Sequence, residues 1–333
     1  MGLEGIKKRL VNCGLFFKAA SWATRKSPRV FMYHRFSSDD RARGRVSAHI
    51  FKWQLGVLSK GWRVITLGEY TAILRRGQSP PSYTVVLTVD DGYRDFYKYA
   101  YPCLREFSLP ATFFPTVNFL DGKWLWWDRI NYAFEKTGKK KFVFEFSGKS
   151  FDIDLGTAEK KERSCLKLSD FCVKADNDLK WALIGELEKG LDVKMPPSPA
   201  EDYRAVSWEE LKELHANGIE IGSHTLDHPI VSRIGIDTLK KELSLSKARL
   251  EEFLGAKVAS FCYPNGKRDD LNGEVRDEVE KAGYAGAVVS YNATGAPDLY
   301  RIPRMGADAD RVDFLWKLCG METFVQRLKR RIS

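Results

Sequence analysis

TVVLTVDDGY, at residues 84–93, joins an apolar run to two adjacent carboxylates, Asp90 and Asp91, and then to a glycine. The apolar part, residues 84–88, predicts a buried strand. Two neighbouring acids at the end of a strand repel each other, so the arrangement needs a cation or a shared proton. The alternative is a plain turn, in which Asp90 caps the next helix and Asp91 and Gly92 make the bend.

The chain on both sides of this segment alternates between strand and helix patterns. Short apolar runs predict further strands at residues 30–33, 112–114, 219–221, 260–263 and 287–289. Periodic segments predict helices at residues 48–60, 67–75, 96–107, 208–217, 236–254 and 273–282. Ser207 and Glu210 form a capping-box pair at the start of the fourth helix, and Gly218 ends it. Such alternation predicts a parallel sheet, either a (β/α) barrel or a doubly wound sheet.

The alternation stops between residues 121 and 202. This segment begins with three tryptophans, Trp124, Trp126 and Trp127, continues through a Lys/Glu-rich helical pattern, and ends at MPPSP, residues 195–199. We interpret it as an insertion mounted on the sheet and closed by a proline-rich linker.

The 333 residues carry 54 Lys and Arg against 44 Asp and Glu, a formal net charge of +10. An excess of this size favours an anionic partner, such as phosphate groups, nucleic acid or a membrane surface. The basic residues gather near the two ends, at Lys7, Lys8, Arg9, Lys18, Arg25, Lys26, Arg29, Arg327, Lys329, Arg330 and Arg331. These ends are either solvated tails or membrane-surface contacts. Nucleic acid is not expected, because the sequence has no RNA-recognition signature and no zinc-finger spacing.

The six cysteines include no C-x-x-C pair, which argues against structural zinc and a thioredoxin-type motif. The start of the chain lacks the features of a signal peptide, and the apolar segment 11–23 is interrupted by Asn12 and Lys18. We therefore expect a cytoplasmic protein with reduced cysteines, at most peripheral to the inner face of the membrane.

Two more predicted strands lead into residues that are candidates for a catalytic or metal-binding site. The strand at 219–221 leads into His224 and His228, whose i, i+4 spacing places both imidazoles on one side of a helical turn, as two ligands of one metal ion. The alternative is a pair of surface or N-cap histidines. The strand at 260–263 ends in a proline-glycine turn, Pro264-Asn265-Gly266. Active sites of barrel and open-sheet folds gather at the carboxyl ends of the strands, where all three features lie.

These motifs resemble the polysaccharide deacetylases, also called NodB-homology domains or carbohydrate esterase family 4. TVDDG at 88–92 is similar to the first motif of that family, HTLDH at 224–228 to the second, and FCYPNG at 261–266 to the third. The resemblance implies a distorted (β/α) barrel with Asp90 as catalytic base. It also implies that Asp91, His224 and His228 bind a divalent metal ion, and that the Asn265 backbone N–H is an oxyanion donor.

The resemblance covers residues 29–118 and 203–306. We accordingly divide the chain into a basic N-terminal segment (1–28), a deacetylase barrel (29–120 and 203–320), a helical and aromatic insertion (121–202) and a basic C-terminal tail (321–333).

The chain departs from the family pattern at two positions. The third motif lacks the arginine that often orients the base, and Cys262 stands near its place; no histidine follows His228, so the late Leu-x-His motif is absent. Some members with a shifted strand order carry a histidine after the first strand and a late I-P-R segment. By that resemblance, His34 is the candidate general acid and Arg304 the candidate partner of Asp90.

The expected function is metal-dependent hydrolysis of the N-acetyl group of an amino sugar, in a surface polysaccharide or its lipid- or nucleotide-linked precursor. Two imidazoles and one carboxylate suit Zn²⁺, and Fe²⁺, Co²⁺ and Ni²⁺ accept the same ligands. The tryptophans of the insertion either form a lid or sugar-stacking wall, or fill the core beneath it. The alternatives are a deacetylase of a small non-sugar amide and an inactive carbohydrate-binding protein.

Overall fold

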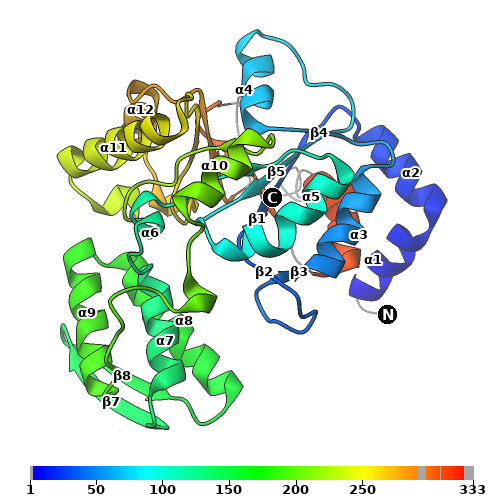
Figure 1. Cartoon of the computed structure of the whole chain (residues 1–333). Helices are drawn as coiled ribbons and strands as arrows, with labels where there is room; N and C mark the ends of the chain where they lie inside the picture. The colour runs from blue at the N-terminus through cyan, green and yellow to red at the C-terminus, as the bar shows by residue number, and fades with distance from the viewer. Residues whose placement is uncertain (1–2, 292–297, 308, 326–333) are drawn as a thin grey trace.

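The computed structural model describes residues 3–291, 298–307 and 309–325. Its centre is a parallel sheet in the order β13-β1-β5-β6-β9, with β4 paired to β5 (Figure 1). The bounds are β1 Arg29–Tyr33, β4 Arg63–Ile65, β5 Thr84–Val89, β6 Thr112–Phe113, β9 Glu220–Ile221 and β13 Met305–Gly306. Every residue of β5 is buried, and its neighbours β1 and β6 bring their carboxyl ends to the same edge of the sheet.

A second parallel sheet contains β10 (Ser260–Cys262), β11 (Gly286–Val289) and β12 (Ile302–Pro303). The two sheets are joined at both edges. Ser223 forms a bridge to Phe261 beyond β9, and the short segment 302–306 gives β12 to one sheet and β13 to the other. The α/β class with a parallel sheet is therefore confirmed, in the form of a distorted barrel whose strands fall into two groups.

Helices cover the outside of these strands. They are α3 Ala48–Leu58, α4 Leu67–Arg75, α5 Tyr101–Phe107, α6 Val117–Leu120, α10 Trp208–Ala216, α11 Ile236–Leu254, α12 Gly273–Lys281 and α13 Arg311–Leu318. The capping box of Ser207 and Glu210 is confirmed at the start of α10. The helix predicted at 96–107 begins with a π-helical turn, Phe96–Ala100, before α5. The short strands β2 (Phe36–Ser37), β3 (Val46–Ser47), β4, β12 and β13 were not predicted from the sequence.

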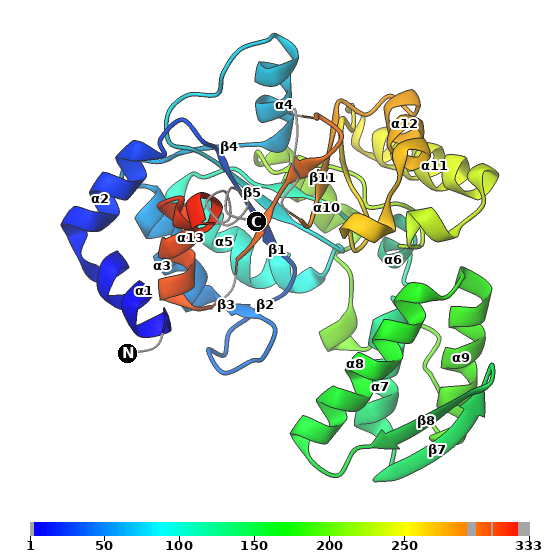
Figure 2. The ribbon, with the colours of Figure 1, turned by 180° about the vertical axis from the view of Figure 1, so that it is seen from behind.

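The insertion lies below the barrel in Figure 2 and has an apolar core of its own. It contains α7 (Trp126–Lys136), a hairpin of β7 (Lys141–Phe146) and β8 (Lys149–Asp154), α8 (Ala158–Lys174) and α9 (Asn177–Gly190). The helices and aromatic residues expected of this segment are present, but the hairpin was not predicted. Phe142, Phe144 and Phe146 alternate with Val143 and Glu145, and Ser147 and Gly148 turn the chain with positive φ angles.

The basic N-terminal segment is folded. Helix α1 (Leu3–Asn12) packs against α13 and against α2 (Gly14–Ala23). Arg29 is no tail residue: it is buried, and its guanidinium donates to the carbonyls of Leu318 (2.8 Å) and Thr24 (2.7 Å). The basic residues Arg327, Lys329, Arg330 and Arg331 lie outside the described residues. All six cysteines are free thiols, and among the described helices none has the length and hydropathy to cross a membrane.

Candidate active site and metal centre

Six of the seven predicted site residues come from the ends of several strands and line one cleft of about 670 Å³, whereas the seventh, Arg304, does not line it and contacts Asp90. Asp90 and Asp91 follow β5, His34 follows β1, and His224 and His228 lie beyond β9. Residues of the insertion also line the cleft: Trp126, Trp127, Asp128, Asn131, Ser169 and Val173. It therefore lies between the barrel and the insertion.

The two histidines converge from a loop and not from the helical turn that their spacing predicted. Thr225 and His228 both have positive φ angles, 67° and 53°, and the His228 N–H donates to the Thr225 hydroxyl (3.0 Å). Buried Glu242 of α11 accepts hydrogen bonds from the backbone N–H groups of Leu226 (2.7 Å) and Asp227 (3.1 Å). This loop places the two imidazole rings 4.6 Å apart.

Asp91, His224 and His228 present three ligand atoms to one point. The Asp91 Oδ1 lies 3.6 Å from the His224 Nε2 and 3.5 Å from the His228 Nε2, and all three side chains are buried. These separations are long for hydrogen bonds. They suit ligands of one tetrahedral cation, since bonds of about 2.1 Å place neighbouring ligand atoms about 3.4 Å apart.

The protonation states of His228 and Asp91 also suit a cation. The His224 Nδ1–H donates to the Cys262 carbonyl oxygen (2.7 Å), so that Nε2 is the ring atom that faces Asp91. Burial opposes protonation of His224, but Cys262 and Asp91 raise its pKa well above the usual value, so a cation at Nε2 has to displace a proton. Burial lowers the pKa of His228 to about 4, which keeps this imidazole neutral. Burial opposes ionisation of Asp91, but the two imidazoles hold its pKa well below its usual value.

Asp90 is held by Arg304, on the segment between β12 and β13. The guanidinium donates to both carboxylate oxygens, at 2.6 and 2.7 Å, and also to the Thr88 hydroxyl at 3.0 Å. Both side chains are buried. Burial opposes ionisation of Asp90, but the charge of Arg304 lowers its pKa below the ordinary range. Asp90 is therefore an ionised, oriented acceptor beside the three ligand atoms.

His34 and Asn265 lie at the open side of the cleft. The side chain of His34 is 44% exposed, and its Nε2 lies 3.7 Å from the Asp90 Oδ2. Asn265 adopts a positive φ of 59°. Its side-chain amide donates to Asp270 at 2.5 Å and its carbonyl accepts from Ser290. Its backbone N–H has no protein hydrogen-bond partner in the described part of the chain, so it can donate to a ligand.

Four residues outside the predicted catalytic and metal-ligand set support one side of the site. The Trp127 ring packs edge-on against the His228 ring, with centroids 4.6 Å apart. Its Nε1–H donates to the Tyr93 hydroxyl (2.8 Å), which donates to buried Asp128 (2.6 Å). The Arg35 guanidinium lies 3.7 Å from the centre of the Tyr93 ring. Because Trp127 lies at the start of α7, the insertion directly contacts His228, a candidate metal ligand.

The other two tryptophans have different environments. Trp126 is part of the core of the insertion, and Trp124 packs against Tyr132 and Tyr203. In the sequence, Trp127 stands out only as one of three clustered tryptophans. No local pattern could predict that its ring contacts His228.

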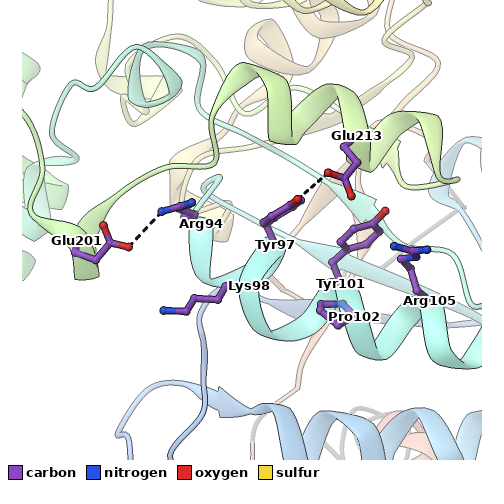
Figure 3. Close-up of a pocket in the computed structure, with 8 residues that line it drawn as sticks. All are labelled: Arg94, Tyr97, Lys98, Tyr101, Pro102, Arg105, Glu201 and Glu213. Carbon is purple, nitrogen blue, oxygen red and sulfur yellow. Dashed lines mark hydrogen bonds and ion pairs between the residues drawn. The ribbon is translucent and has the colours of Figure 1, made fainter.

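A separate hollow lies on the outside of the barrel, over α5 and α10 (Figure 3). Several of its polar groups pair with one another. Arg94 contacts Glu201 (3.3 Å), and the Tyr97 hydroxyl donates to Glu213 (2.7 Å). None of the residues predicted for the site lines this hollow.

Comparison with known proteins gives one family. The family model described as polysaccharide deacetylase matches residues 77–136 and 181–287, about half of the chain, and leaves out β7, β8 and α8. The Bacillus subtilis protein YxkH, assigned as a polysaccharide deacetylase, is 22% identical over 294 residues, which are 86% of this chain and 74% of that protein. A poly-beta-1,6-N-acetyl-D-glucosamine N-deacetylase of Escherichia coli is 32% identical over 71 residues, only 21% of this chain and 10% of that protein.

Solved structures show the same fold. The Streptococcus pyogenes deacetylase PplD, in complex with acetate, has a TM-score of 0.58 at 17% identity and covers 87% of this chain and 97% of its own. IcaB from Ammonifex degensii has a TM-score of 0.56 at 20% identity and covers 88% of this chain and 96% of its own. Together with the match to the family model, these similarities show that the chain belongs to the polysaccharide deacetylase family.

Proposed function

We propose that the chain removes the N-acetyl group from an amino sugar of a surface polysaccharide or of its carrier-linked precursor, with the help of a divalent metal ion. The observation that carries this proposal is the position of ionised Asp90 beside the three converging ligand atoms of Asp91, His224 and His228. A proton acceptor and a cation site side by side are what amide hydrolysis requires.

The donor set fits a divalent cation. Asp91, His224 and His228 would hold it through one carboxylate oxygen and two imidazole nitrogens, a set that Zn²⁺ prefers and that Fe²⁺, Co²⁺ and Ni²⁺ also accept. Such a cation lowers the pKa of water and polarises a carbonyl oxygen.

The protein residues carry the proton transfers. Asp90, fixed by Arg304, takes a proton from water as the water oxygen forms a bond to the acetyl carbon. The Asn265 backbone N–H donates to the oxyanion that develops on the carbonyl oxygen. His34 gives a proton to the nitrogen as the C–N bond breaks, so that acetate and a free amine leave. Its partial exposure beside Asp90 suits both this transfer and reprotonation from solvent.

The amino-sugar substrate is supported by the relative from Escherichia coli, whose name states poly-beta-1,6-N-acetyl-D-glucosamine as its substrate. The exposed part of the Trp127 ring offers an aromatic wall to a sugar face. A small non-sugar amide is the alternative substrate within the same chemistry. An inactive carbohydrate-binding protein is disfavoured, because Asp90 and the three ligand residues are all present and placed together.

Mass spectrometry of N-acetylglucosamine oligomers, nucleotide sugars and lipid-linked sugars, incubated with metal-loaded protein, tests the proposal. We expect one class to lose one acetyl group per reacting sugar. Asp90→Asn should bind metal normally and lose at least about a hundredfold in rate, the usual scale of general-base catalysis. Binding of an oligomer without any loss of acetyl would instead assign the chain to the carbohydrate-binding alternative, and near-normal turnover by Asp90→Asn would place the base elsewhere.

A further inference from the structure

Helices α1 and α2 occupy the side of the barrel opposite the insertion, in both views of the ribbon (Figures 1 and 2). Their inner side is attached to the barrel. Val11 and Ser21 are buried there, and the Thr24 hydroxyl, just after α2, donates to the Cys319 carbonyl at 2.9 Å. The cleft is lined by other elements, so the outer side of α1 and α2 has no part in the proposed reaction.

The outer side of α2 exposes large apolar residues. Leu15 is 80% exposed and Trp22 is 61% exposed. They lie seven residues apart, on one face of the helix, with Lys18 and Ala19 between them. Ile6, on the neighbouring helix α1, is 43% exposed. Exposed apolar residues gathered on one surface usually mark a contact site.

The charges around these apolar residues are almost all positive. Residues 3–28 contain six basic side chains, Lys7, Lys8, Arg9, Lys18, Arg25 and Lys26, and one acidic side chain, Glu4. None of the six forms an ion pair within the described ranges. The Arg25 guanidinium instead lies 4.3 Å from the centre of the Trp22 ring. A surface with this composition is complementary to an anionic one.

We propose that the outer face of α1 and α2 docks on an anionic membrane surface. Leu15, Trp22 and Ile6 enter the boundary between headgroups and acyl chains, as is typical of interfacial helices, and the lysines and arginines lie against lipid phosphates. A second copy of the chain fits this face less well, because a two-fold contact would bring the same positive charges together.

Two double variants test the two parts of this contact. Leu15→Ser with Trp22→Ser removes the apolar part, and Lys18→Glu with Lys26→Glu reverses the charge. The substituted side chains are exposed, so both variants should fold. The matched control is Leu166→Ser with Lys167→Glu, on the exposed side of α8, where Leu166 is 64% exposed.

The measurement is sedimentation with vesicles of phosphatidylcholine, with and without phosphatidylglycerol, at low and high salt. We expect the unaltered protein to sediment only with the anionic vesicles and mainly at low salt. Each lysine near an anionic surface contributes about fivefold to partitioning, so the lysine variant should bind at least about tenfold more weakly. The apolar variant should also lose binding, whereas the α8 control should bind normally.

Three results would overturn the proposal. The first is no binding to anionic vesicles at low salt. The second is a loss of vesicle binding in the α8 control as large as that in the α2 variants, which would mean that binding depends on net charge and not on this face. The third comes from sedimentation velocity without vesicles: self-association that Leu15→Ser with Trp22→Ser abolishes would assign this face to a second copy. Deacetylation of a soluble oligomer is measured in parallel, and it should be unchanged in all the variants.

Discussion

In the barrel, the cleft residues stand at or beyond the ends of parallel strands and most of them are charged or polar, whereas in the insertion they lie on helices α7 and α8 and the largest are aromatic. Asp90 of the barrel is buried and paired with Arg304. The insertion instead contributes Trp127, whose ring contacts the ligand residue His228. Under the proposed function, the barrel supplies the reacting groups, and the insertion supports and covers them.

The largest effect is expected from loss of a ligand in the barrel. His228→Ala should abolish stoichiometric metal binding, because two remaining ligands hold a divalent cation poorly. Elemental analysis of the purified variant measures this. His49→Ala is the control, since His49 is exposed and pairs with Asp40 away from the cleft. Full metal occupancy in His228→Ala would remove His228 from the ligand set.

An intermediate effect is expected from Trp127, although it belongs to the insertion. Trp127→Ala should weaken metal binding by about ten- to a hundredfold, the scale found when a residue that orients a ligand is lost. Trp127→Phe keeps a ring against His228 but loses the hydrogen bond to Tyr93. Its metal affinity should lie between that of Trp127→Ala and that of the unaltered protein. Competition with a chelator measures the affinity.

Trp181→Phe, on α9, is the control for the tryptophan series, because Trp181 does not line the cleft. Unchanged metal affinity in Trp127→Ala would mean that the barrel builds the metal centre alone. The insertion would then act on the substrate only.

The smallest effect concerns stability. Lys180 of α9 is buried with its Nζ 5.6 Å from the centre of the Trp126 ring, and it has no ion pair among the described residues. Burial lowers its pKa to about 8. The ammonium group of Lys180 holds its proton more tightly in the unfolded chain than in the folded one. Below about pH 8 this difference lowers the free energy of unfolding by its full amount. The loss of stability fades as the pH approaches about 10.4, the ordinary pKa of lysine.

Lys180→Met should therefore raise the free energy of unfolding at pH 7 by on the order of 2 kcal/mol, with a smaller gain at about pH 9.5. Urea unfolding at the two pH values measures both gains. An equal gain at both would show that the charge of Lys180 is not the cause.

The sequence predicted strands β1 and β5, because each is a largely apolar run that leads into polar residues. It did not predict the hairpin of the insertion, although Phe142, Phe144 and Phe146 alternate there, because the Lys/Glu-rich composition of the whole segment favoured helices over this short alternation. The loop conformation of His228 and its contact with Trp127 depend on residues about a hundred positions apart, which local periodicity cannot reveal. Arg304 came from family resemblance, and no feature of spacing linked it to Asp90.

The pairing of Asp90 with Arg304 spans 214 residues of chain. During synthesis, Asp90 leaves the ribosome long before its partner, and the two can meet only when residues 302–306 have joined the two sheets. Until then the carboxylate has no arginine to fix it. A nascent or prematurely ended chain therefore lacks an oriented Asp90 carboxylate even if its earlier strands have folded, so that, under the proposed function, activity would begin only when the barrel is nearly complete.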